Sequence, residues 1–120
     1  MINANSIIRI IASLKLGASA GDKISQAADL LYDRNDPDKC NEGIRLLDSI
    51  GIGSKPKYGE EIICATIYYL KAMFYYSLDD IDNALYCLDV VEKVPSGYVI
   101  FGRRTLLDIK ASAKELEDEI

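Results

Sequence analysis

A chain of 120 residues, of which 49% are apolar and 28% charged, is long enough to form one soluble globular domain with its own core. Its formal net charge is −5 and no segment concentrates Lys and Arg, which argues against nucleic-acid binding, because phosphate recognition requires clustered positive charge. The chain has no histidine and no CxxC sequence, so a zinc site would lack most of its usual ligands. We therefore predict a single domain over residues 1–120 that needs no metal or other cofactor, with three reduced, buried cysteines: Cys40, Cys64 and Cys87.

Residues 1–20 predict an N-terminal arm with an amphipathic helix that caps the domain. The apolar side chains recur at helical spacing: Ile7, Ile8, Ile11 and Leu14. The segment contains Arg9 and Lys15 but no acidic residue, so a mitochondrial presequence remains an alternative. A secretory signal peptide is disfavoured because Arg9 interrupts the apolar run. Nowhere does the sequence contain an uninterrupted apolar run of about 18 residues, the length expected of a membrane-spanning helix.

The segment 22–50 predicts two helices joined by an acidic turn. Asp22 is the expected N-cap of a helix that runs to about Asp33, and Pro37 suits the first turn of the helix that follows. The sequence GIGSKPKYGE at 51–60 has three glycines and a proline, and predicts a loop.

Three more helices complete an all-α chain. They are expected at about Glu60–Leu78, from the Asp79–Asp80 turn to Lys93, and from Tyr98 to Glu119. The last of these is apolar at its start and strongly charged at its end. Together with the first three helices, they make six helices in antiparallel pairs.

Residues 22–50 and 60–95 form two copies of one helical hairpin, related by an offset of 44 residues. The offset aligns residues of like kind: Ala28 with Ala72, Leu31 with Tyr75, Asp36 with Asp80, Cys40 with Ala84, Ile44 with Leu88 and Leu47 with Val91. Small residues at this spacing let paired helices approach closely, as in the tetratricopeptide unit. We therefore predict a tetratricopeptide-like bundle or short right-handed superhelix with two central hairpin repeats, capped by the helices within 1–20 and 98–119.

The helix at 60–78 carries the aromatic run IYYLKAMFYY and is apolar on almost every face, as expected of a central helix. The stripe of Tyr68, Ala72 and Tyr75 is expected to lie in the core. The stripe of Tyr69, Met73 and Tyr76 is expected to face the concave groove of the repeats, although an intramolecular cover, such as the first helix, is an equal alternative. The predicted partner-binding groove consists of Ser25, Asp29, Tyr32, Thr66, Tyr69, Met73 and Tyr76.

Nothing in the sequence points to catalysis, and we expect a binding protein. Histidine, the commonest general base, is absent, and GIGSK at 51–55 does not satisfy the phosphate-loop pattern. The carboxylates of Asp79, Asp80 and Asp82 are expected to favour the N-terminus of the next helix.

The sequences ADLLYDRNDPDKCNEGIRLLDSI at 28–50 and YYLKAMFYYSLDDIDNALYCLDVVEKVP at 68–95 resemble the cytosolic domain of the mitochondrial fission 1 protein family. The resemblance covers about residues 20–115. It implies six helices with two tetratricopeptide-like pairs, and a tail-anchored adaptor on the cytosolic face of the mitochondrial outer membrane, and also of peroxisomes. It further implies recruitment of a dynamin-related GTPase, or of other fission adaptors, through groove residues such as Tyr32, Tyr69, Met73 and Tyr76.

This chain departs from the family in three respects. The C-terminal membrane anchor is not within residues 1–120, and the first helix is basic where the family has an acidic arm. The connection GIGSKPKYGEE at 51–61 is also longer than that of the family. The alternative function is a soluble tetratricopeptide-like module with a different partner, such as a chaperone cofactor that recognises peptide termini. That class holds a carboxylate with basic groove residues, whereas Ser25, Asp29, Tyr69 and Met73 are not basic.

Overall fold

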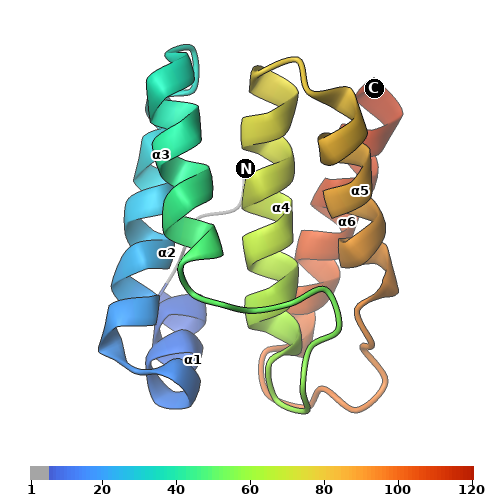
Figure 1. The fold of residues 1–120 in the computed structure, drawn as a ribbon. Coiled ribbons are helices and arrows are strands. Elements are labelled where there is room, and N and C mark those ends of the chain that lie inside the picture. The colour runs from blue at the N-terminus through green and yellow to red at the C-terminus, as the bar shows by residue number, and fades with distance from the viewer. Residues whose placement is uncertain (1–5) are drawn as a thin grey trace.

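The computed structural model describes residues 6–120, which fold into six α-helices and one short 3₁₀ turn joined by loops (Figure 1). They are α1 (Ser6–Leu16), α2 (Ala18–Leu30), η1 (Leu31–Asp33), α3 (Pro37–Asp48), α4 (Glu61–Ser77), α5 (Ile81–Lys93) and α6 (Arg103–Glu119). Successive helices run in opposite directions, and α4 lies in the middle (Figure 1). The all-α prediction is confirmed for the described residues.

The interhelical turns give the molecule two chemically different ends. The segments 49–60 and 94–102 lie together at one end, which we call the loop end (Figure 1). The turns at 31–36 and 78–80 lie at the opposite end with the C-terminus (Figure 1). We call this the acidic end, because its turns and the last turn of α6 carry many carboxylates: Asp33, Asp36, Asp79, Asp80, Glu115, Glu117, Asp118 and Glu119.

The acidic turns start their helices as the sequence predicts. The side chain of Asp36 caps α3 by accepting a hydrogen bond from the backbone N–H of Asp38 at 2.9 Å, and Pro37 follows in the first turn. The side chain of Asp80, 44 positions later, caps α5 by accepting a hydrogen bond from the N–H of Asn83 at 3.3 Å. The offset between the two hairpins is therefore reproduced in their capping.

Two predicted helix starts are wrong. α2 begins at Ala18 and not at Asp22, because Gly17 alone makes the break, with φ of +96°. α6 begins at Arg103 and not at Tyr98, since Gly102, with φ of +78°, separates residues 98–101 from the helix. The apolar residues expected in the first turn of that helix therefore lie in a loop.

The core surrounds α4, which contacts α1, α2, α3, α5 and α6. All nine residues from Ile62 to Leu70 are buried, so the prediction of a central helix is confirmed. In the stripe expected to be core, Tyr68 and Ala72 are buried and Tyr75 is half-buried. α1 also belongs to the core, with Ile8 and Ala12 fully inaccessible.

Lys71, in the second half of α4, forms an ion pair with Asp48 of α3. Lys71 Nζ lies 2.7 Å from Asp48 Oδ1 and 4.9 Å from the centre of the Tyr68 ring. Burial alone would lower the pKa of Lys71, but the hydrogen bond and charge of Asp48 outweigh it and raise the pKa. The ammonium group therefore remains charged where α3 packs on α4.

The closest approach of α3 to α4 depends on Gly43. A Cβ atom at this position would overlap the ring of Phe74, which is fully buried. We expect Gly43→Ala to destabilise the fold by about 1–3 kcal/mol, even though alanine favours a helix by about 1 kcal/mol. Urea denaturation measures this, with Gly53→Ala in the open loop as the control. A Gly43→Ala variant as stable as the parent would contradict the contact.

Candidate protein-binding surface

Thr66 does not line a groove. It is 1% exposed, and its hydroxyl donates a hydrogen bond to the Ile62 carbonyl at 2.8 Å, one turn earlier in α4. The helix is covered on every side at this level, so no partner reaches the Thr66 side chain. Its predicted place in the groove is wrong.

Tyr69 is also covered, and the last helix lies against its hydroxyl. It is 5% exposed, and its hydroxyl faces Ser112, Glu115 and Glu119 of α6. Burial and the two nearby carboxylates raise the pKa of Tyr69, against the opposing hydrogen bond to Ser112. The alternative of an intramolecular cover therefore holds for Tyr69, with α6 as the covering element.

Exposure increases along α4 towards the acidic end. Met73 is half-buried and packs against the edge of the core, and Tyr76 is 38% exposed. Together they present one sulfur-containing and one aromatic side chain on the last turn and a half of the helix. These two residues remain accessible, as the sequence analysis expected.

The predicted residues of α2 and η1 divide between two surfaces. Tyr32 is 71% exposed at the acidic end and occupies the position equivalent to Tyr76 under the 44-residue offset. Asp29 lines a shallow pocket of about 270 Å³ whose other residues come from α2, α3 and η1 alone. Ser25 is half-buried on α2, one turn before Asp29.

Three residues of the predicted groove remain accessible at the acidic end, and we refer to them together as the tyrosine surface: Tyr32, Met73 and Tyr76. Tyr32 lies in the 31–36 turn between α2 and α3, and Tyr76 lies in the last turn of α4, next to the 78–80 turn. The carboxylates of the two turns give this end a strongly negative charge. Such a surface suits a partner segment that is apolar on one side and basic on the other.

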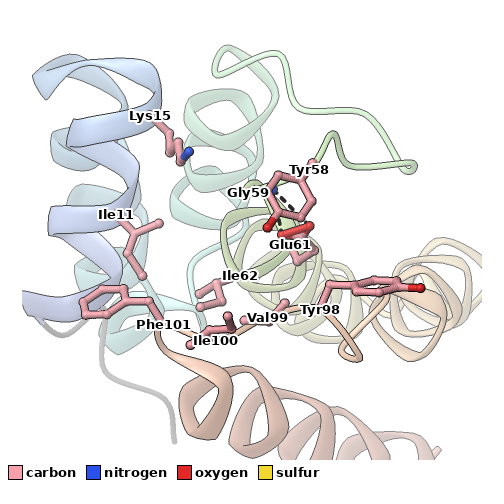
Figure 2. Close-up of a pocket in the computed structure, with 10 residues that line it drawn as sticks. All are labelled: Ile11, Lys15, Tyr58, Gly59, Glu61, Ile62, Tyr98, Val99, Ile100 and Phe101. Atoms are coloured by element: carbon pink, nitrogen blue, oxygen red, sulfur yellow. Dashed lines mark hydrogen bonds between the residues drawn. The ribbon is translucent and has the colours of Figure 1, made fainter.

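A second apolar surface, which the sequence analysis missed, lies at the loop end. It surrounds a pocket of about 320 Å³ between α1, the start of α4 and the segment that leads into α6 (Figure 2). Four of its side chains are among the most exposed large apolar residues of the described chain: Tyr58, Tyr98, Ile100 and Phe101. The sequence did contain an indication of this loop. Gly97 and Gly102 flank an apolar run of residues 98–101, which is too short to form a helix by itself.

The cysteines and carboxylates of the described residues do not gather into a metal site. Residues 6–120 contain no group of three or more Cys, Asp or Glu placed to hold a metal ion. Cys40, Cys64 and Cys87 are free and buried, as predicted, and burial raises the pKa of each thiol. Raised thiol pKa values keep these groups protonated, which makes them poor nucleophiles. Among the described helices, none is both long and apolar enough to cross a bilayer.

Comparison of the chain with protein-family models, with curated proteins and with solved structures gives no match.

Proposed function

We propose that this protein is a non-catalytic adaptor that binds a protein partner through the tyrosine surface. The observation that carries the proposal is the pair of exposed tyrosines, Tyr32 and Tyr76, placed equivalently in two hairpins at the acidic end. Tyrosine is favoured at binding surfaces because it offers a large rigid contact area and a hydroxyl for the wet rim.

The repeated hairpins support a tetratricopeptide-like arrangement as part of this proposal. At positions related by the offset, the second helices bury like residues: Cys40 and Ala84, Ile44 and Leu88, Leu47 and Val91. Repeats of this kind present their first helices on a common face, where a partner helix or peptide binds. In this arrangement η1, which follows α2, and the last turns of α4 supply the accessible residues.

The specific partner that we propose follows from the resemblance to mitochondrial fission 1 proteins. It is a dynamin-related GTPase or another fission adaptor, recruited at the mitochondrial outer membrane, and also at peroxisomes, by a tail-anchored protein. The negative charge around the tyrosine surface further favours a basic amphipathic segment of that partner.

Replacing Tyr76 or Met73 with alanine tests the surface. We expect each variant to weaken binding of a purified dynamin-related GTPase by about 1–2 kcal/mol, because aromatic and sulfur-containing anchors supply much of the energy of an interface. Titration calorimetry measures the change. Since neither side chain is fully buried, the loss of folding stability should be modest.

The matched controls are Ala72→Leu and Ala84→Leu. Both alanines are fully buried between helices, so the larger side chain should overpack the core and cost about 1–3 kcal/mol of stability. Equal thermal destabilisation in all four variants would mean that Met73 and Tyr76 serve only the core. Binding of a basic amphipathic peptide but not of the GTPase would favour the alternative, a tetratricopeptide-like module with another partner.

A further inference from the structure

We propose that the loop end binds the surface of an anionic lipid bilayer, with the side chains of Tyr58, Tyr98, Ile100 and Phe101 inserted among the headgroups. This site goes beyond the proposed adaptor function and does not depend on it, because the tyrosine surface lies at the opposite end of the helices.

The first observation is the exposure of these apolar side chains. Ile100 is 92% exposed, Tyr58 82%, Tyr98 81% and Phe101 69%. They come from two segments, 49–60 and 94–102, and surround one pocket (Figure 2). Exposed aromatic and aliphatic residues gathered in this way mark a binding surface, and aromatic rings with polar tips are enriched at the level of lipid headgroups.

The two loops are held in place by contacts that a larger residue would prevent. A Cβ atom on Gly102 would lie 2.5 Å from Ile62 Cδ1 of α4 and 3.4 Å from Ile11 Cδ1 of α1. A Cβ atom on Gly59 would lie 2.9 Å from Lys15 Nζ. Both glycines have positive φ, +78° and +89° respectively. The loops therefore pack on α1 and α4 through their glycines, while the neighbouring apolar side chains extend into solvent.

The second observation is the positive charge around these four exposed apolar residues, which we call the apolar patch: Tyr58, Tyr98, Ile100 and Phe101. The net charge of the whole chain, by contrast, is negative. Lys15, Lys55, Lys57 and Arg103 are exposed, and none makes a salt bridge to another described residue. Two carboxylates lie on the same segment: Glu60 accepts a hydrogen bond from Lys57 N–H, and Glu61 accepts one from Gly59 N–H at 2.9 Å. The four cations outnumber these two carboxylates.

This separation of charge favours a bilayer over a protein groove as the occupant. Free cations beside exposed apolar side chains complement the negative surface of anionic lipids, to which each Lys or Arg contributes about a fivefold gain in binding. The carboxylates of the acidic end would be repelled by the same surface. A bilayer bound in this way would have the loop end against the lipid and the tyrosine surface facing solvent. This orientation is opposite to the one that a membrane anchor directly after α6 would impose.

The absence of tryptophan from the sequence allows a direct test with the 120-residue chain. Ile100→Trp places a fluorescent reporter in the patch, and Tyr32→Trp places one at the acidic end, at a residue as exposed as Phe101. With vesicles of equal parts phosphatidylcholine and phosphatidylserine, we expect the emission of the Ile100→Trp variant to shift to the blue and to be quenched by brominated lipid. The emission of the Tyr32→Trp variant should stay unchanged.

Two further variants separate the apolar from the electrostatic part of the interaction. Phe101→Ser is expected to weaken vesicle binding about tenfold in flotation assays, since burial of a large apolar side chain is lost. Arg103→Glu should weaken it about fivefold or more, and Lys114→Glu, near the acidic end and far from the lipid, should leave it unchanged or only slightly weaker. Circular dichroism checks that each variant is folded.

Three results would overturn the proposal. One is the lack of any shift in the Ile100→Trp variant, and another is an equal shift in both tryptophan variants. The third is a blue shift of the Ile100→Trp variant that appears without vesicles as the protein concentration rises, which would show that a second copy of the chain covers the patch. Partner binding at Tyr76 is measured without lipid, so failure of one proposal leaves the other standing.

Discussion

Phe74→Ala is expected to lower the free energy of unfolding by about 3–5 kcal/mol, the usual cost of removing a fully buried aromatic ring. Phe74 is completely inaccessible on α4, and its ring lies against the Gly43 backbone of α3. The alanine variant leaves a cavity at the junction of the two hairpins, which the neighbouring helices cannot close without losing their own contacts.

Urea denaturation measures the effect, provided that the dependence on denaturant is unchanged between variants. Tyr32→Ala is the control, because the Tyr32 ring is 71% exposed and its removal should alter stability by less than about 0.5 kcal/mol. If Phe74→Ala lowered the free energy of unfolding as little as Tyr32→Ala, the packing of α3 on α4 would be contradicted.

Alkaline pH is expected to destabilise the protein steeply through its buried thiols. Burial raises the pKa of Cys64 from 9.0 to about 12, and that of Cys87 from 9.0 to about 11. Above pH 9 the unfolded chain releases these protons while the native protein retains them, so the free energy of unfolding falls as the pH rises. Each thiol contributes about 1.4 kcal/mol per pH unit, and the two together about 3 kcal/mol per unit up to the native pKa of Cys87.

Urea unfolding at a series of pH values under reducing conditions tests this expectation. The double variant Cys64→Ala, Cys87→Ala should be less stable near neutrality but lose stability much more gradually above pH 9. A residual slope is expected above about pH 10, because burial also raises the pKa of Tyr68, Tyr69 and Tyr75. Identical slopes for the parent and the double variant would exclude the thiols as the cause.

The candidate site could be predicted only in part. Helical periodicity correctly assigned Tyr68 and Ala72 to a buried face of α4, since it depends on the chain geometry within a single helix. It could not determine which apolar face is covered by a distant element. Tyr69 and Tyr76 lie on one helical stripe with Met73, yet α6 covers the first and leaves the second accessible.

At the loop end, periodicity predicted a helix where the structure has an exposed loop. Val99, Ile100 and Phe101 have the composition of a helix start, and the sequence analysis placed them in one. Gly102 adopts positive φ where it packs against Ile62 and Ile11, and this tertiary contact keeps residues 98–101 out of α6. Their exposure, and the surface that they form with Tyr58, depend on that contact.

By itself the sequence determined the all-α class, the acidic turns that precede α3 and α5, the 51–60 loop and the central position of α4. These features are local, because they depend on the hydrogen bonds, dihedral angles and apolar periodicity of neighbouring residues. The tertiary structure decided the cover of Tyr69 by α6, the contact of Gly43 with Phe74 and the placement of the acidic end opposite the loop end. These features depend on which helices pack together although they are far apart in the sequence. The spacing of side chains within one helix does not specify its packing partners.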